Sequence, residues 1–267
     1  MQVGVSTASL FMRQDNEEAL QTLNGLGVKT TEVFLTSYFQ YGKGYAQRLL
    51  QSRGDICVNS VHDLTSQFEP QLFSRHDGVR QDAYNMLGQV MESAQLLDAP
   101  YYTFHGITRA KKTERLGEKD DFTHWGNCFR NLLDFCQGYG VKLCLETVEW
   151  STYNRPGVFA KIAGRVPNLL GVLDIKQTRI SGYGYEPYLK EMGNKIAYVH
   201  LSDVTEEGKM CLPGNGAFDF DDLIVRLKDV GFDGALLIEA YERDYDDIPQ
   251  LKQSCEYLQE LVYKHGC

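Results

Sequence analysis

The sequence lacks the features that mark secreted, membrane-spanning and nucleic-acid-binding proteins. No run approaches the roughly 20 apolar residues of a membrane span, and the start, MQVGVSTASLF, has neither the basic nor the long apolar segment of a signal peptide. The seven cysteines are scattered and form no C-x-x-C pair, which predicts reduced thiols in a reducing compartment. A net charge of −9 would repel phosphate backbones and anionic lipids. We therefore expect a cytoplasmic protein with no membrane or nucleic-acid partner.

Strand-like and helix-like segments alternate along the whole chain. Short apolar, β-branched runs recur eight times, at residues 2–6, 31–35, 56–61, 101–105, 142–147, 169–174, 196–201 and 235–240. Stretches of helical period lie between them, for example at 16–26, 79–97, 122–137, 220–229 and 249–264. This alternation predicts parallel strands, and although an open doubly wound sheet would also show it, eight repeats in 267 residues favour a barrel. We predict an α/β fold, a single (β/α)₈ TIM barrel domain over residues 1–267.

Two predicted connections are longer than packing requires. They cover residues 63–78, after the third predicted strand, and residues 106–121, after the fourth. Long βα loops usually serve function, and in a barrel they border the face at the carboxyl ends of the strands. We therefore expect a binding site at that face.

Four consecutive predicted strands each carry one ionisable residue near the carboxyl end: Glu146 in LCLETV, Asp174 in GVLDIK, His200 in YVHLSD and Glu239 in LLIEAY. Each alone could be a solvated strand-end charge or an ion-pair partner, but together they can converge in a barrel mouth, where a buried charge is costly unless it is paired or bound to metal. Three carboxylates and one imidazole suit Mn²⁺, Co²⁺, Mg²⁺ or Zn²⁺. We predict one divalent metal ion that leaves room for two substrate oxygens, as proton transfer beside a carbonyl requires.

Other polar residues are predicted near the same face. His62 and His105 end the third and fourth strands, and Lys176 and Arg179 follow Asp174. We expect these four side chains to bind substrate oxygens, with core, capping or loop positions as the alternative. Glu32 stands before the apolar part of its strand and is a lesser candidate. The segment 212–220, LPGNGAFDF, predicts a turn, and its unspecific glycine pattern only weakly indicates a phosphate site.

In this order, these residues resemble the xylose isomerase-like barrel superfamily, which includes sugar isomerases, ketose 3-epimerases, inosose dehydratases and type IV apurinic endonucleases. The resemblance spans nearly the whole chain and is carried by LETVE, LDIKQ, HLSD followed by LPGNGAFDF, and LLIEAY. In the epimerase branch, the residues that match Glu146, Asp174, His200 and Glu239 hold one metal, and the two glutamates exchange protons on opposite faces of the substrate. The resemblance therefore implies that Glu146 and Glu239 are catalytic.

One position departs from the pattern of both branches. The epimerases usually have a histidine three residues after the metal-binding aspartate, where this chain has Gln177. The endonucleases bind three zinc ions, and this chain has only part of that ligand set, with no Asp-x-His pair after the seventh strand. We therefore do not expect a DNA-repair enzyme, and the departure leaves the sugar unidentified.

The expected activity is isomerisation or epimerisation of a small sugar, sugar phosphate or polyol through an enediolate. The metal would bind the carbonyl and a neighbouring hydroxyl so that Glu146 or Glu239 can remove the intervening proton. An inosose or keto-sugar dehydratase using the same site, and a non-catalytic sugar- or metal-binding barrel, are the alternatives. The 16 tyrosines suggest aromatic loops that cover either the sugar or a partner subunit in a homo-oligomer.

Overall fold

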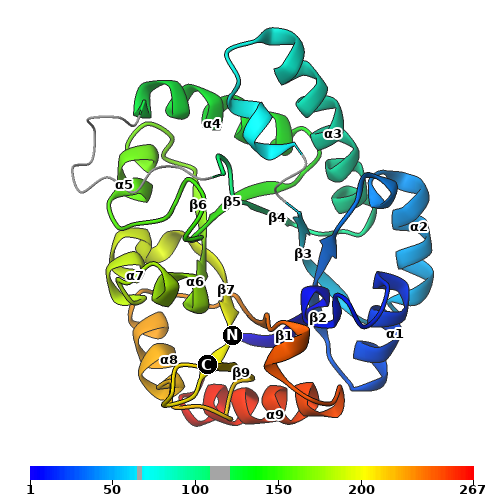
Figure 1. The fold of residues 1–267 in the computed structure, drawn as a ribbon, viewed down its shortest axis with the longest axis vertical. Coiled ribbons are helices and arrows are strands. Elements are labelled where there is room, and N and C mark those ends of the chain that lie inside the picture. The colour runs from blue at the N-terminus through cyan, green and yellow to red at the C-terminus, as the bar shows by residue number, and fades with distance from the viewer. Residues whose placement is uncertain (65–67, 109–120) are drawn as a thin grey trace.

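The chain forms a closed barrel of eight parallel strands surrounded by helices (Figure 1). The computed structural model describes residues 1–64, 68–108 and 121–267. Strand order round the barrel is β1-β10-β7-β6-β5-β4-β3-β2, so the first and last strands close it. The barrel strands are β1 (Gln2–Ser6), β2 (Thr30–Leu35), β3 (Cys57–Asp63), β4 (Tyr101–Phe104), β5 (Lys142–Glu146), β6 (Leu170–Asp174), β7 (Ile196–Leu201) and β10 (Ala235–Ile238). The predicted (β/α)₈ fold is confirmed.

Helices form the outer layer because each turns an apolar stripe toward the strands. In α8, for example, Leu223, Ile224 and Leu227 are buried. The α-helices are α1 (Asn16–Gly25), α2 (Lys43–Ser52), α3 (Asp77–Leu96), α4 (Phe122–Gln137), α5 (Val158–Ala163), α6 (Ile175–Ile180), α7 (Glu186–Met192), α8 (Phe220–Asp229) and α9 (Pro249–Lys264). Short 3₁₀ helices are η1 (Thr7–Leu10), η2 (Tyr38–Gln40), η3 (Glu69–Phe73), η4 (Gly193–Lys195) and η5 (Glu242–Asp244). Among the described residues, no helix has the length and apolar character needed to cross a membrane.

The inside of the barrel has its own small hydrophobic core, separate from the larger one between strands and helices. It contains Cys144, Val172, Tyr198 and Leu237. Alternate side chains of a strand point to the same face, so the residue two positions later on each of these strands also points inward. Those residues are the four ionisable ones of the predicted site: Glu146, Asp174, His200 and Glu239.

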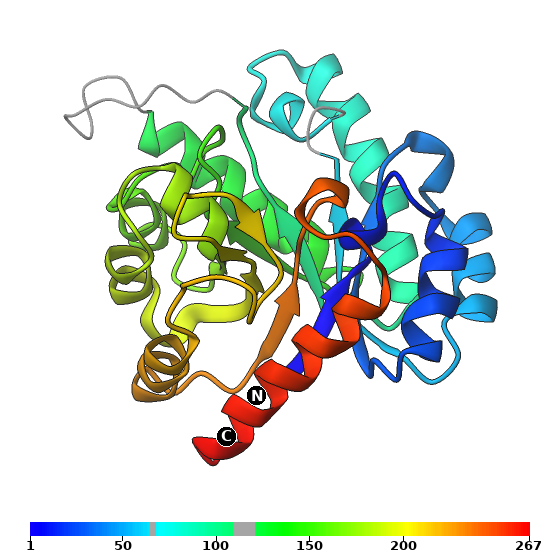
Figure 2. The same cartoon turned by 60° about the horizontal axis from the view of Figure 1, so that its bottom comes forward.

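The carboxyl ends of the strands lie together at one end of the barrel. In Figure 2, β1 and β10 run upward to this end, and both chain termini lie at the other. The long connection predicted at residues 63–78 contains η3. Most of the connection predicted at 106–121, and residues 65–67 of the first, lie outside the described residues. An antiparallel hairpin that the sequence did not predict, β8 (Asp203–Val204) with β9 (Met210–Cys211), follows β7.

Candidate metal centre

Strands β5, β6, β7 and β10 bring Glu146, Asp174, His200 and Glu239 together. All four are buried, and one possible ligand atom from each lies within 4.8 Å of the others. His200 Nδ1 lies 2.7 Å from Glu146 Oε1 and 2.6 Å from Glu239 Oε2. The predicted convergence of these side chains is therefore present, while their role as metal ligands remains a prediction.

The donor atoms of this cluster fit a divalent cation. Three carboxylates and an imidazole offer the oxygen and nitrogen donors that Mg²⁺, Mn²⁺, Co²⁺ and Zn²⁺ accept. Glu239 Oε2 is buried and makes no hydrogen bond of good geometry with any described residue, in spite of its short distance to His200. A buried charged oxygen without a hydrogen bond is costly, and a bound cation would offset that cost.

The electrostatics of the cluster favour positive charge within it. Burial would raise the pKa of Glu146, but hydrogen bonds from His105 and His200 hold it well below its usual value. Burial raises the pKa of Asp174 to about 7. Burial would lower the pKa of His200, but the charges of Glu32 and Glu239 raise it well above its usual value. Glu146 is thus held as an anion, whereas a positive charge beside Asp174 would be needed to favour its charged form.

His62 and His105 lie beside the same cluster. Their Nε2 atoms are 2.9 Å apart, and His105 Nε2 is 3.0 Å from Glu146 Oε2. Glu69, from η3, accepts the backbone N–H of His105 at 2.9 Å and lies 3.3 Å from its Nδ1. Although burial would lower it, the pKa of His105 is raised to about 10 by Glu69 and Glu146. Both histidines face the cavity, where their predicted contact with substrate remains a prediction.

A cavity of about 450 Å³ adjoins the cluster. Its polar lining includes His62, His105, Glu146, Asp174, Gln177 and Glu239. Its apolar lining includes Phe11, Phe34, Leu64, Val148, Trp150 and Tyr241. The Trp150 ring stacks on His105 with the ring centroids 5.3 Å apart. A cavity of this size, with a polar floor and aromatic walls, suits a small ligand that has both hydroxyl groups and C–H faces.

The two cations predicted after Asp174 both line a neighbouring cavity, and neither is among the residues that line the cavity beside the cluster. Lys176 is buried, with Nζ 3.8 Å from the centre of the Tyr241 ring. That Nζ has no hydrogen-bond partner among the described residues. Burial would lower the pKa of Lys176, but the charges of Asp174 and Glu239 raise it, so the ammonium stays charged beside the cluster. Arg179 is exposed and lines a neighbouring cavity, and the structure does not bring it to the cluster.

Gln177, which replaces the expected histidine, also lines the cavity. Its backbone N–H donates to Asp174 Oδ1 at 2.7 Å, and its side-chain oxygen accepts the backbone N–H of Glu149 at 3.3 Å. The first bond fixes the orientation of the Asp174 carboxylate. The second ties α6 to the loop after β5.

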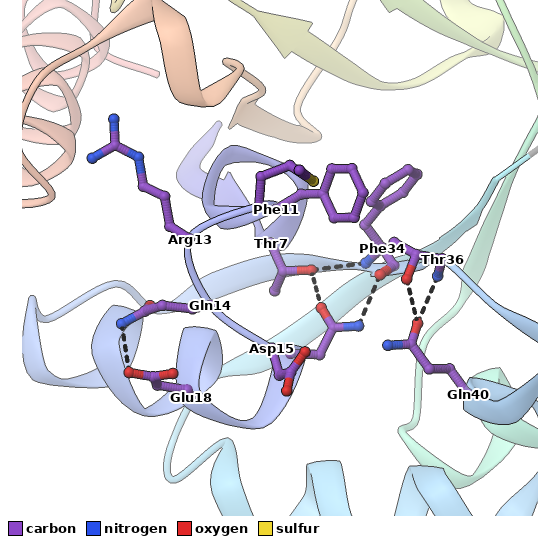
Figure 3. A pocket seen from close by; sticks show the side chains of 11 residues that line it. Thr7, Phe11, Arg13, Gln14, Asp15, Glu18, Phe34, Thr36 and Gln40 are labelled. Carbon is purple, nitrogen blue, oxygen red and sulfur yellow. Dashed lines mark hydrogen bonds between the residues drawn. The ribbon is translucent and has the colours of Figure 1, made fainter.

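Phe11 and Phe34 also line another cavity, of about 390 Å³ (Figure 3). Thr7 Oγ1 donates to Asn16 Oδ1 at 2.7 Å and accepts the backbone N–H of Phe34 at 2.8 Å. Asn16 Nδ2 donates to the carbonyl of Phe34 at 2.8 Å. These bonds hold the end of β2 in place, so the Phe34 ring is a fixed wall of the first cavity.

Asp203 organises the glycine-containing segment 212–220. Its carboxylate accepts four backbone N–H groups at 2.7 to 3.0 Å, those of Val204, Gly214, Gly216 and Phe218. Because both glycine N–H groups already have this acceptor, they are not available to a phosphate. The motif HLSD followed by LPGNGAF is therefore explained here by loop structure, and the weak indication of a phosphate site receives no support.

Asp203→Ala is expected to lower the free energy of unfolding by about 3 kcal/mol, because it deprives several N–H groups of a charged acceptor. Urea denaturation monitored by circular dichroism measures the change. Asp233→Ala is the control, since Asp233 is exposed and pairs only with the N-terminal amine among the described groups. Equal unfolding midpoints for the two variants would show that Asp203 does not organise the loop.

Several residues that line or support the site were not predicted from the sequence. Trp150 and Tyr241 follow the strands that end in Glu146 and Glu239, so the rule that βα loops border a barrel site could have indicated them. Glu69 lies in the long connection 63–78 that was predicted to serve function. No local signal distinguishes it there from other acidic loop residues.

The chain is similar to two inosose isomerases over part of its length. It is 25% identical over 192 residues to an inosose isomerase from Halalkalibacterium halodurans, a match that covers 66% of each protein. It is 28% identical over 127 residues to an inosose isomerase from Bacillus subtilis, covering 43% of this chain and 45% of that relative. The matches therefore leave at least a third of each relative uncovered.

Solved structures with the same fold cover nearly the whole chain. A D-psicose 3-epimerase from Clostridium cellulolyticum H10, crystallised with D-tagatose, has a TM-score of 0.78 at 16% identity, covering 98% of this chain and 99% of that one. The IOLI protein with a bound zinc atom has a TM-score of 0.77 at 20% identity, covering 99% of both chains. At these identities the similarity shows the fold. The family model of the xylose isomerase-like TIM barrel matches residues 20–261, and the chain therefore belongs to that family.

Proposed function

We propose that this protein is a divalent-metal-dependent isomerase or epimerase of a small sugar, sugar phosphate or polyol. The observation that carries the proposal is the pair of buried glutamates, Glu146 and Glu239, which lie 2.7 Å and 2.6 Å from His200 Nδ1 at the edge of a small aromatic-walled cavity. Relatives named inosose isomerase and D-psicose 3-epimerase support a carbohydrate substrate.

Glu146, Asp174, His200 and Glu239 are the residues that would hold the metal. An ion bound there would polarise a substrate carbonyl and its neighbouring hydroxyl, which makes the C–H bond between them more acidic. The protein prepares this site before substrate arrives, because Thr147 Oγ1 accepts the backbone N–H of Asp174 at 2.8 Å and Gln177 fixes its carboxylate. Mn²⁺, Co²⁺, Mg²⁺ and Zn²⁺ are all compatible with these donors.

The two glutamates would perform the proton transfers. One carboxylate takes the proton from the carbon beside the carbonyl, which gives an enediolate, and the other returns a proton to the same carbon from the opposite face. The product is then an epimer. Return of the proton to the adjacent carbon would instead interconvert an aldose and a ketose. His105 Nε2, 3.0 Å from Glu146 Oε2, would donate a hydrogen bond to the carboxylate that exchanges the proton.

Lys176, His62 and His105 would bind substrate oxygens. A buried ammonium without a hydrogen bond is unfavourable, and a substrate oxygen would supply the acceptor that Lys176 Nζ lacks among the described residues. Trp150 and Phe34 would contact the C–H face of the substrate. A contact between Arg179 and substrate remains a prediction without structural support at this cavity.

Metal analysis followed by hydrogen exchange tests the proposal. We expect the purified protein to hold a divalent ion in a ratio of about one per chain, the stoichiometry of a single three-carboxylate, one-imidazole site. We also expect metal-dependent incorporation of deuterium from D₂O beside the carbonyl of at least one sugar in a panel of ketoses, ketose phosphates and inososes, measured by NMR and mass spectrometry.

The other outcomes of that experiment each point away from the proposal. A product that has lost the mass of water identifies a dehydratase. Tight binding of a sugar without deuterium incorporation identifies a non-catalytic binding protein. A ratio near three zinc ions per chain would indicate a site of the endonuclease kind.

A further inference from the structure

A cavity of about 630 Å³ lies at the end of the barrel opposite the candidate metal centre. It is formed by the carboxyl-terminal half of α4, the start of β5, the connection from α5 to β6, and η4, which precedes β7. The carboxyl ends of these strands carry Glu146, Asp174 and His200, so their amino ends and this cavity face away from the site. Both chain termini lie at the same end of the barrel in Figure 2. A cavity of this size is large enough for a small molecule.

The charged residues that line this cavity are four cations and one carboxylate. The cations are Arg130, Lys142, Arg165 and Lys195, and the carboxylate is that of Asp134. The whole chain has the opposite balance, with 27 lysines and arginines against 36 aspartates and glutamates. A cavity lined mainly by one sign of charge concentrates the electric field and attracts ions of the opposite sign. We call the cavity that these five residues line the basic cavity.

The positive charge of the basic cavity is not neutralised by the described part of the chain. None of the four cations forms an ion pair with a carboxylate of the described residues, Asp134 included. Arg130 donates to the carbonyl of Arg165 at 3.3 Å. Arg165 and Lys195 likewise donate to backbone carbonyls. Because carbonyl groups carry no net charge, these bonds orient the side chains and leave their charge available to an anion.

Helix ends explain only part of this charge. A cation is stabilised at the carboxyl end of a helix, and Arg165 follows α5, where it donates to the carbonyl of Lys161 at 3.1 Å. Lys142 is instead the first residue of a strand, and Arg130 lies in the interior of α4. Their position around one cavity therefore needs a different explanation.

We propose that the basic cavity binds a small molecule that carries several linked phosphate groups, either an inorganic polyphosphate or a nucleotide. Lysine and arginine side chains bind phosphate oxygens through charge-assisted hydrogen bonds, and several cations around one cavity suit a ligand with several negative charges. Leu133, Val141 and Leu170 also line the cavity, together with the amides of Asn168 and Asn194. These groups would contact the uncharged part of a nucleotide. The proposal goes beyond the proposed isomerase function and does not rest on it, because the two sites lie at opposite ends of the barrel.

Isothermal titration calorimetry of the full-length protein with ATP and with tripolyphosphate tests the proposal. The protein is kept free of metal, so that phosphate cannot bind through an ion at the candidate metal centre. We expect saturable binding at about one ligand per chain, and the affinity should fall as the salt concentration rises, because the cations are exposed to solvent. Tighter binding of ATP than of tripolyphosphate would assign a nucleotide to the cavity, and binding of ATP that is no tighter would assign an inorganic polyphosphate.

A double variant, Arg130→Gln with Lys142→Gln, locates the binding. Both side chains are exposed, and we expect their loss to weaken binding by about 10-fold. Lys43→Gln with Arg48→Gln is the matched control, because it removes the same charge from exposed positions of α2, and it should bind as the wild type does. Circular dichroism checks folding, and the two single variants replace the double variant if it does not fold. Absence of saturable binding to the wild type, full affinity after loss of Arg130 and Lys142, or an equal loss in the control would overturn the proposal.

Discussion

Glu239→Gln is expected to slow the interconversion of the two epimers by about 10²- to 10⁴-fold, the range for loss of a general acid or base. The amide keeps the shape of the side chain but cannot accept the substrate proton. Its remaining oxygen still faces His200, so the rate is measured at saturating metal to separate proton transfer from metal loss. The measurement is the initial rate with whichever sugar exchanges deuterium in the wild type.

Glu239→Gln also has a signature that a general loss of structure would not give. If Glu146 and Glu239 act on opposite faces, each single variant keeps the base for one face. Glu239→Gln should therefore still exchange deuterium into one epimer while failing to convert it, and Glu146→Gln should do so with the other epimer.

Glu242→Gln is the matched control, since Glu242 is an exposed glutamate of η5 three residues further along. We expect wild-type rates from it. Full interconversion by metal-loaded Glu239→Gln would show that this carboxylate does not carry a proton.

The fold and the four central residues of the site could be predicted because the signals for them are local. Successive side chains of a strand point to opposite faces, so a residue two positions after an inward-pointing one also points inward. Glu146, two positions after Cys144, is an example. The order of such strands then indicates that their ends are neighbours. No long-range contact is needed for either step.

Glu32 and Glu69 could not be predicted in the same way because distant partners determine their burial. Glu32 depends on hydroxyls of Ser60 and Thr103, which are 28 and 71 residues away in the chain. Glu69 depends on the backbone of His105 and on the Tyr102 hydroxyl, which donates to it at 2.7 Å. A carboxylate in a sequence does not show whether such donors will surround it.

The role of the segment after β7 was difficult to predict from the sequence for a related reason. The glycines of 212–220 resemble a phosphate loop until the acceptor of their N–H groups is known, and that acceptor is Asp203, 11 residues before Gly214. Arg179 is close to Asp174 in the sequence, yet the structure does not bring it to the cluster, and its contact with substrate stays a prediction. It stands near the end of the short helix α6, where it is exposed.

His200→Ala is expected to remove the metal and, with it, the deuterium exchange. His200 Nδ1 contacts both Glu146 and Glu239, so its loss deletes a nitrogen donor and leaves two buried carboxylates without the ring that both contact. Loss of a residue that supports a metal ligand typically lowers metal affinity by about 10- to 100-fold. Loss of a ligand itself should lower it further, so we expect Co²⁺ affinity to fall by more than about 10²-fold. Metal content after dialysis and Co²⁺ titration measure this, with circular dichroism as the check of folding.

Two other histidines supply the control for His200→Ala and the test of a different metal position. His265 is near the end of the chain and pairs with Asp221. The variant His265→Ala should keep both the metal and the activity. If His200→Ala kept its metal, the ion would have to lie elsewhere, and the described residues offer another buried group in His62, His105 and Glu146. His105→Ala would then release the ion that His200→Ala retained. That pair of results would move the metal toward β3 and β4 and would remove Asp174 and Glu239 from its ligands, because Glu146 alone belongs to both groups.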